Sequence, residues 1–471
     1  MLKTLSSVNS WWQTGVIPAE YIFAAKRNEL LEIINLLTER RITVVSGPRR
    51  VGKSILLFNT IEHLLAGGVT AKRILHFSGD DVGLFLDGST IIDIISTFCN
   101  DVLGENIAAL SDMIYIFIDE IHFIKNWQQY LKNYFDRRLK IKFIVSGSSS
   151  THLFDGAIES LMGRCDDVYV FPLSFREFIQ FDIVYNGNNV DISPTNDLHL
   201  SDAINNPAVF HKTVIKLIPY MTNYEAKITL ALNNYLLTGG YPEWFETKTV
   251  AQWQRRLEQD IVQKSLYRDI VSIHGITNPE YLEKILHFIA ANQGQTTSYS
   301  TIAQTVGADS VTVTTYIRYL CQACLLGLLE NYSANAGKII RKNRKLFVYD
   351  SGICNALTRT QTLSPEIFGQ AAENCVRELF QKHADYNHNK LYYWRDGDKE
   401  VDLIADTKNA ITPIEIKYRN EIKQNDLKGL TAFENQYSPA TSLIITKQTL
   451  INDGKRYYYP LWLFALAKYQ T

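Results

Sequence analysis

The sequence lacks the features that define several large classes of protein. No uninterrupted apolar run reaches about 18 residues, so no membrane-spanning helix is expected. Only six cysteines occur in 471 residues, and only Cys321 and Cys324 lie close together. No second Cys or His pair stands at zinc spacing, which favours a buried structural role for this pair over metal binding. The net charge of −1 excludes a uniformly basic protein that coats nucleic acid, but it does not exclude a local basic patch.

The composition is that of a folded chain with several cores. Hydrophobic residues make up 46% of it, and 26 tyrosines with 22 phenylalanines argue against low-complexity disorder. A length of 471 residues predicts two or three domains. Scattered cysteines, which indicate reduced thiols, and the lack of a cleavable signal peptide predict a cytoplasmic protein.

Short apolar runs alternate with helical segments from about residue 40 to residue 174. Apolar strands that alternate with helices predict an α/β domain whose parallel sheet is covered on both faces. A helical stretch follows, and its polar segment at residues 186–206, rich in Asn, Asp, Ser and Pro, predicts a loop. The five predicted strands are residues 42–45, 74–77, 115–118, 143–145 and 168–171.

A glycine-rich segment that follows the first predicted strand fits the pattern G-x-x-x-x-G-K-[ST] completely. Glycines allow a loop to wrap around a phosphate, and the next helix adds its positive N-terminal end. Lys53 is expected to reach the β- and γ-phosphates of ATP, and the Ser54 hydroxyl to bind Mg²⁺. The expected nucleotide-binding residues are Gly47, Pro48, Arg49, Arg50, Val51, Gly52, Lys53, Ser54 and Ile55.

The third predicted strand ends in two acids, Asp119 and Glu120. Asp119 is expected beside the Mg²⁺ ion, and Glu120 is placed to orient and deprotonate the attacking water. Solvated acids at a strand end are the alternative, which the phosphate-binding loop makes weaker. Since both acids are present, the sequence predicts ATP hydrolysis as well as binding.

Two further positions are candidates for sensing or completing the nucleotide site. Ser148 or Ser149, at the end of the fourth predicted strand, would act as a sensor residue that detects the γ-phosphate, with a plain turn as the alternative. Arg164 is a candidate arginine finger that reaches the nucleotide of a neighbouring subunit, with an ordinary surface arginine as the alternative.

These motifs resemble the AAA-type ATPases of a large bacterial and archaeal family with a poorly characterised C-terminal domain. The resemblance implies a sheet of the additional-strand, catalytic-glutamate division and a ring or other homo-oligomer. Where that family often has Gln, this sequence has His122, to which we assign no chemistry. The residues that carry the resemblance are those at 47–54, 119–122, 146–150, 162–164, 171–178, 237–243 and 348–352.

Three predicted helices at residues 281–291, 300–306 and 310–321, and a strand at 325–329, are typical of a winged helix-turn-helix. Its recognition helix would expose the polar side that carries Thr312, Thr314, Thr315, Tyr316, Arg318 and Tyr319. A basic wing beside this helix predicts contact with DNA phosphates, and a protein-binding module is the alternative. The wing residues are Lys338, Arg341, Lys342, Arg344 and Lys345.

The C-terminal region predicts a helix at residues 371–382 and strands at 391–394, 400–405 and 412–417. Alternation puts Glu400 and Asp402 on one face of a strand, and Glu415 and Lys417 on one face of the next. Such a cluster suits magnesium-assisted phosphodiester hydrolysis. Charged residues that protect an edge strand are the alternative.

These C-terminal residues also resemble the restriction-endonuclease fold, whose pattern of Asp followed by Glu-x-Lys matches Asp402, Glu415 and Lys417. The resemblance adds Glu373, on the preceding helix, to the metal site. Relatives of this kind are often described as having such a domain, with the cleaving activity mostly inferred.

The expected organisation has four parts: a P-loop AAA-type core at 1–180, a helical connector at 181–279, a winged helix at 280–350 and a restriction-endonuclease-like domain at 351–471. The predicted function is an ATP-driven machine that acts on branched, broken or foreign DNA. The alternative is a nucleotide-dependent switch or chaperone-like regulator whose nuclease-like domain only binds.

Overall fold

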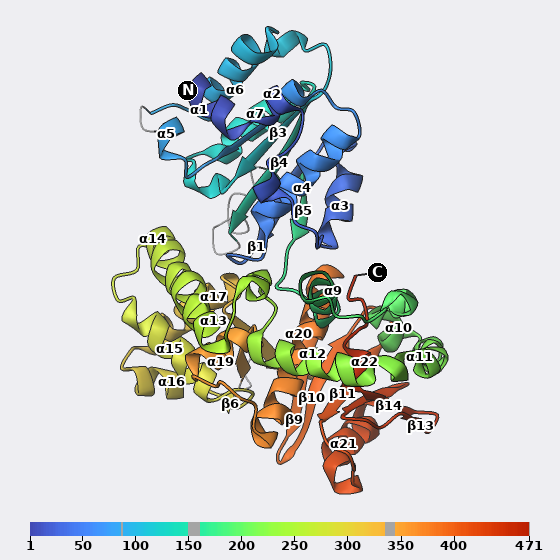
Figure 1. Ribbon diagram of the computed structural model, residues 1–471. Coiled ribbons are helices and arrows are strands. Elements are labelled where there is room, and N and C mark those ends of the chain that lie inside the picture. Colours follow the sequence, from blue (N-terminus) through green and yellow to red (C-terminus); the bar gives the residue numbers. More distant parts are fainter. Residues whose placement is uncertain (86–87, 149–160, 335–343, 471) are drawn as a thin grey trace. The chain divides into compact units, whose positions relative to one another are not determined.

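The computed structural model describes residues 1–85, 88–148, 161–334 and 344–470. The chain divides into two compact units, Met1–Phe171 and Pro172–Thr471 (Figure 1). Among the described residues, no helix has both the length and the apolar character needed to cross a membrane. The finer division of the second unit into connector, winged helix and nuclease-like domain stays a prediction.

The N-terminal unit is built on a five-stranded parallel sheet in the order β2-β3-β4-β1-β5. The sheet confirms the predicted α/β class, and all five predicted strands are present. β4 lies between β1 and β3, so an additional strand separates the strand that enters the glycine-rich loop from the strand that ends in Asp119. The strands are β1 Ile42–Gly47, β2 Ile74–Ser78, β3 Ile114–Asp119, β4 Ile141–Ser148 and β5 Cys165–Tyr169.

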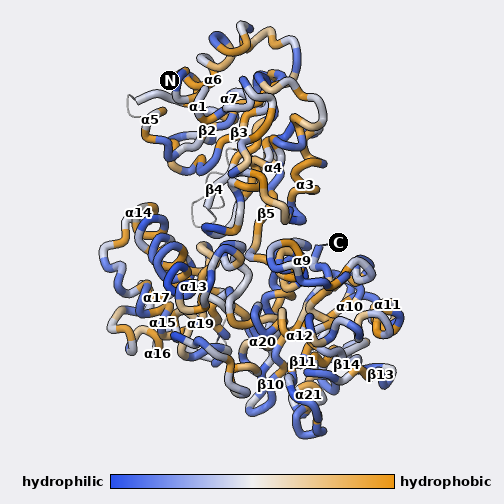
Figure 2. Tube along the Cα trace, in the orientation of Figure 1, coloured by the Kyte–Doolittle hydropathy of each residue, from blue (hydrophilic) through white to orange (hydrophobic). Residues whose placement is uncertain are grey.

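Buried aliphatic and aromatic residues hold this sheet to its helices. β1 and β4 are buried along their whole length, and Figure 2 shows the central strands as largely hydrophobic stretches. Val44 and Phe143 share a core cluster with Trp127 and Leu131, so the sheet is buried against helix α7. The helices of this unit are α1 Leu2–Val8, α2 Trp11–Thr14, α3 Glu29–Leu36, α4 Lys53–Ala66, α5 Val82–Phe85, α6 Ile91–Thr97 and α7 Trp127–Asp136.

The N-terminal segment covers the edge strand β2. The Asn9 amide donates to the backbone oxygen of His76 (2.8 Å) and accepts from its backbone nitrogen (2.6 Å). The indole nitrogens of Trp11 and Trp12 both donate to the oxygen of Ile74. These side chains satisfy backbone groups that an edge strand would otherwise expose.

The C-terminal unit contains one mixed nine-stranded sheet in the order β13-β14-β12-β11-β10-β9-β7-β8-β6. β7 pairs with β8 as an antiparallel hairpin and with β9 in parallel, so the hairpin continues into the sheet that carries Asp402 and Glu415. The strands are β6 Thr296–Thr297, β7 Leu326–Asn331, β8 Arg344–Val348, β9 Lys390–Asp396, β10 Lys399–Asp406, β11 Ile411–Lys417, β12 Ser442–Thr446, β13 Ile451–Asn452 and β14 Arg456–Pro460.

Helices form at every position where the spacing predicted one in this unit, but the loop predicted at 186–206 is partly wrong. That segment contains helix α10 (Leu200–Asn205), because Leu200, Ala203 and Ile204 are buried and anchor it. The other helices are α9 Phe175–Asn186, α11 Pro207–Met221, α12 Glu225–Thr238, α13 Val250–Arg256, α14 Val271–His274, α15 Glu280–Ala291, α16 Tyr299–Val306, α17 Ser310–Gln322, α19 Ser351–Leu357, α20 Pro365–Tyr386, α21 Lys428–Tyr437 and α22 Leu461–Phe464.

Candidate active sites

The glycine-rich loop connects the end of β1 to the start of α4. Gly47, Arg50 and Gly52 have φ angles of 154°, 60° and 99°, a backbone shape that most side chains resist. A Cβ atom on Gly47 would overlap the carbonyl oxygen of Val170, so only glycine fits there. The loop therefore places its amides at the N-terminus of a 14-residue helix, where backbone N–H groups and the helix dipole attract anions.

Lys53 is the buried cation of this loop, with only 5% of its surface exposed. Its side-chain nitrogen donates to the oxygens of Gly47 (3.1 Å) and Pro48 (2.7 Å). Ser54 and Ile55 follow it on the first turn of α4 and are half-buried, as is Arg49, whereas Arg50 is exposed. The structure thus brings the Lys53 ammonium, the Ser54 hydroxyl and the backbone amides of the loop together at the carboxyl end of the sheet.

Asp119 and Glu120 lie at the same end of the sheet, after β3. Asp119 is buried, and its Oδ1 accepts hydrogen bonds from the Ser146 hydroxyl and from the Glu120 backbone nitrogen. The Glu120 nitrogen also lies 3.1 Å from Ser146 Oγ. Glu120 has a φ of 47°, so the chain turns sharply at this residue. The Glu120 carboxylate therefore does not continue the direction of β3.

Ser146 was missed by the sequence analysis, which considered Ser148 and Ser149. The signal was present, because residues 146 and 148 share a face of β4 by alternation. Ser148 is buried and stands in register with Gly47, at the entrance of the loop. Ser149 lies outside the described residues.

Two histidines flank these acids. His122 Nδ1 lies 3.3 Å from Glu120 Oε2, so the position to which no chemistry was assigned contacts the candidate base. His76 is buried on β2, where burial lowers its pKa more strongly than the nearby Asp119 raises it. A neutral His76 leaves the negative charge of Asp119 uncompensated on that side.

Arg164 lies at the opposite end of the sheet from the loop. Its backbone oxygen accepts from the nitrogen of Ile42, the first residue of β1, whereas the loop follows the last residue of that strand. Six strand residues span about 20 Å, so Arg164 is far from the loop of its own chain. Its Nε donates to Asp136 Oδ1 (2.9 Å), and Arg164 Nη2 lies 3.4 Å from Oδ2.

The second candidate site lies on β10 and β11 of the C-terminal unit. Asp402 Oδ2 accepts a hydrogen bond of 2.8 Å from the Ile416 nitrogen and lies 3.8 Å from Lys417 Nζ. Lys417 also forms an ion pair with Glu415. The structure thus brings Asp402, Glu415 and Lys417 together.

Burial and charge shape the ionisation of this cluster. Burial, and then the charge of Asp402, raises the pKa of Glu415 to about 8. Burial lowers the pKa of Lys417, but Asp402, Glu415 and Glu373 outweigh it and raise the pKa of the ammonium overall. Glu415 Oε2 finds no hydrogen-bond partner among the residues that the structure describes.

Glu373 stands on α20, where its Oε1 accepts a 2.7 Å hydrogen bond from Arg377 Nη2. The guanidinium of Arg377 in turn lies 4.4 Å from the ring centre of Phe347. Within the part of the chain that the structure covers, no group of three or more His, Cys, Asp or Glu side chains is arranged to hold a metal ion. As they lie here, the carboxylates are held by Lys417 and Arg377.

The predicted basic wing needs correction. Lys345 is buried in β8 and forms an ion pair with the half-buried Glu400, so Lys345 does not add to a basic surface. Arg344 lies 3.7 Å from Glu330 and 5.1 Å from the ring centre of Tyr299. These contacts arise because the hairpin joins the large sheet. Lys338, Arg341 and Lys342 lie outside the described residues.

The polar side of α17 also differs from the prediction at Tyr316, which is buried with 8% of its surface exposed. Thr312 Oγ1 donates to Asp309 Oδ2, and the guanidinium of Arg318 lies 5.3 Å from the ring centre of Tyr319. Thr314, Arg318 and Val311 are exposed. The accessible side of this helix therefore combines hydroxyl groups, one cation and one valine.

Comparison with protein families agrees with the geometry of the N-terminal unit. Residues 39–179 match the model of an AAA domain. The match and the five-stranded parallel sheet support an AAA-type P-loop ATPase, and with it nucleotide binding and ATP-dependent activity. Residues 229–364 and 368–464 match two domains of unknown function (DUF8612 and DUF4143).

Several relatives resemble this chain over most of its length. An uncharacterized protein of Haemophilus influenzae is 23% identical over 459 residues, which cover 93% of this chain and 98% of that protein. An uncharacterized protein of Methanocaldococcus jannaschii is 22% identical over 375 residues, which cover 78% of this chain and 73% of that protein.

Two solved structures are similar only in part. "Structure of C. elegans PCH-2" is 14% identical, with a TM-score of 0.23, over 42% of this chain and 50% of that chain. The Hsp104:casein complex of S. cerevisiae is 19% identical, with a TM-score of 0.25, over 38% of this chain and 33% of that chain. At these TM-scores the likeness carries no argument about function.

Proposed function

We propose that the protein hydrolyses ATP at the loop Gly47–Ser54 and uses the energy to act on DNA. The observation that carries the first part is the convergence of Lys53, Asp119 and Ser146 at the carboxyl end of β1, β3 and β4. A buried lysine and a buried hydrogen-bonded carboxylate at one sheet edge suit a polyphosphate and its cation.

The residues present fit magnesium as well as nucleotide. Ser54 and Asp119 would hold Mg²⁺, which supplies charge neutralisation at the phosphate oxygens when it is bound. Lys53 would leave the oxygens of Gly47 and Pro48 and turn toward the β- and γ-phosphates. Glu120 would orient the attacking water and take its proton, and its Oε2 lies 3.3 Å from His122 Nδ1.

We further propose that the protein works as a homo-oligomer, such as a ring, in which Arg164 of one subunit reaches the nucleotide of another. Arg164 lies at the end of the sheet away from its own loop, so it would serve only the site of another subunit. Ser148, in register with Gly47, would sense the γ-phosphate.

The DNA-directed part rests on the C-terminal unit. Residues 280–350 would form a winged helix and residues 351–471 a restriction-endonuclease-like domain, with residues 181–279 as a helical connector. Asp402, Glu415 and Glu373 would hold Mg²⁺ for phosphodiester cleavage, with Lys417 steadying the developing charge. The buried, unpartnered Oε2 of Glu415 supports this reading, because a cation would satisfy it.

A specific observation favours the alternative function, a nucleotide-dependent switch whose nuclease-like domain only binds. Lys417 lies against both Asp402 and Glu415, and Glu373 accepts from Arg377. In this arrangement Lys417 and Arg377 already neutralise the carboxylates, as ion pairs with a purely structural role would.

One experiment separates the two functions. ATP turnover is measured with and without single-stranded, duplex and branched DNA, and Mg²⁺-dependent cleavage is followed for the wild type, Asp402→Asn and Lys417→Met. Cleavage that both variants lose supports the nuclease. If the wild type cuts none of the DNAs and none of them stimulates turnover, the switch is the better description.

A further inference from the structure

One buried arginine contacts both the phosphate-binding loop and the last residue of the N-terminal unit. Arg27 Nη1 donates to the carbonyl oxygen of Val51 (3.0 Å), and Arg27 Nη2 donates to that of Phe171 (2.8 Å). Glu29 fixes the guanidinium through two contacts of 3.3 and 3.0 Å, and both side chains are almost fully buried. Because the guanidinium is planar and Glu29 holds it, it keeps the carbonyl oxygens of Val51 and Phe171 at a fixed separation.

The bond to Val51 sets the direction of a loop amide. The carbonyl of Val51 and the N–H of Gly52 belong to one planar trans peptide, so they point in opposite directions. Because Arg27 holds the Val51 oxygen, the Gly52 N–H points away from Arg27. Arg50 and Gly52, on either side of Val51, both have positive φ angles, so the chain turns sharply before and after this residue.

The chain enters the C-terminal unit at Pro172, directly after Phe171, and it is held again at the next residue, Leu173. Leu173 N donates to the Gly240 oxygen (2.6 Å), and the Leu173 oxygen accepts from the Tyr235 hydroxyl (3.0 Å) and from Lys382 Nζ (3.2 Å). A Cβ atom on Gly240 would overlap the oxygen of Leu173, so the two backbones meet where only glycine fits.

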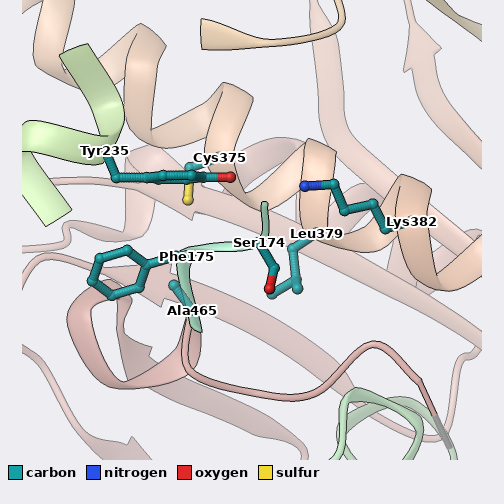
Figure 3. Close-up of a pocket in the computed structure, with 7 residues that line it drawn as sticks. All are labelled: Ser174, Phe175, Tyr235, Cys375, Leu379, Lys382 and Ala465. Atoms are coloured by element: carbon teal, nitrogen blue, oxygen red, sulfur yellow. The ribbon is translucent and has the colours of Figure 1, made fainter. Parts of the chain in front are cut away.

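Figure 3 shows the small cavity beside this anchor, with Tyr235 and Lys382 among the side chains around it. Its volume is about 10 Å³, so the side chains of Tyr235 and Lys382 that hold Leu173 stand in a closely packed region. Lys382 forms a buried ion pair of 2.8 Å with Glu378, one turn earlier on α20. The same helix carries Glu373 of the second candidate site.

We propose that Arg27 is a positioning residue that couples occupancy of the phosphate-binding loop to the chain segment 171–173 and, through it, to helix α20. The coupling runs through the covalent chain: Pro172 alone separates Phe171, held by Arg27, from Leu173, held by Lys382. A phosphate that draws the Gly52 N–H turns the Val51 peptide, and the guanidinium transfers that shift to Phe171. The proposal rests on the proposed nucleotide binding.

Amide hydrogen exchange of the full-length protein tests the coupling, with and without a non-hydrolysable ATP analogue and Mg²⁺. In the wild type the analogue is expected to change exchange at Leu173 and in α20. Arg27→Lys keeps the charge beside Glu29 but cannot span both oxygens, so it should bind the analogue and lose this response. Lys26→Gln is the matched control: the Lys26 ammonium donates to Asn59 and Glu62, away from the bonds that Arg27 makes, so this variant should respond as the wild type does.

Linkage provides a second test that does not touch Arg27. Tyr235→Phe removes one hydrogen bond to Leu173, and because coupling is reciprocal it should shift analogue affinity roughly two- to thirtyfold. A wild type that binds the analogue without any change at Leu173 or α20, an Arg27→Lys protein with the full response, or unchanged affinity in Tyr235→Phe overturns the coupling. A wild type that does not bind the analogue overturns the proposed ATPase function itself.

Discussion

The side-chain nitrogen of Lys53 donates a hydrogen bond of 2.7 Å to the carbonyl oxygen of Pro48, in the loop to which both residues belong. The loop therefore uses its own backbone to hold the cation that a polyphosphate would attract. Exchanging these carbonyl partners for phosphate oxygens replaces neutral acceptors by charged ones, which form stronger hydrogen bonds.

Lys53→Ala should lower ATP turnover by about a hundredfold or more, because it removes the buried ammonium group that would contact the phosphates. The measurement is steady-state phosphate release with saturating ATP and Mg²⁺. Lys26→Gln is the control, since Lys26 also lies next to α4 but pairs with Glu62 at the surface. Turnover that survives in Lys53→Ala would contradict the assignment of this loop.

Glu120→Gln should separate binding from hydrolysis. The amide keeps the size of the side chain but accepts no proton from water, so turnover should fall by about 10²- to 10⁴-fold while nucleotide affinity changes little. Affinity is measured by calorimetry and turnover by phosphate release on the same sample. A variant that hydrolyses ATP at the wild-type rate would assign the base to another residue.

Arg164→Ala and Lys53→Ala should complement each other if the finger acts between subunits. Each variant alone should lose most of its turnover, since an arginine finger contributes on the order of 10³-fold. In an equal mixture, a Lys53→Ala subunit can offer its intact Arg164 to the intact loop of an Arg164→Ala subunit, so turnover should partly return. A mixture as inactive as its components would leave Arg164 as the partner of Asp136.

Glu32 should make stability depend on pH. Burial, and then the charge of Glu29, raises the pKa of Glu32 to about 7, from 4.5. The folded state therefore keeps a proton that the unfolded state has released, and stability falls as the pH rises from about 4.5 to about 7. Because Glu32 is partly exposed, solvent screening reduces this cost to about 1 kcal/mol.

Glu32→Gln removes that ionisation, so the variant should melt about 2–4 °C above the wild type at pH 8 and at the same temperature at pH 4.5. Thermal unfolding at the two pH values measures the difference. Glu39→Gln, at an exposed position of the same segment, is the control. An equal difference at both pH values would show that Glu32 acts through packing and not through its charge.

Much of the N-terminal unit could be predicted because its signals are contiguous. The strand that ends at Gly47, the loop to Ser54 and the helix that follows form one uninterrupted segment, and its glycines and lysine stand in a fixed order. The pair Asp119–Glu120 is equally local. The polar composition around Leu200–Asn205 predicted a loop, but this segment forms a helix. The helix depends on the burial of its apolar residues, which composition does not reveal.

The sequence by itself determined the alternation of strands and helices, the loop that turns around a phosphate and the acids at a strand end. These depend on neighbours within a few positions. Only the tertiary structure decided that Ser146 touches Asp119, that Lys345 is buried against Glu400, and that Arg27 reaches Phe171, 144 positions away. Such contacts depend on strand order and register, which place distant segments side by side and which no local pattern of residues encodes.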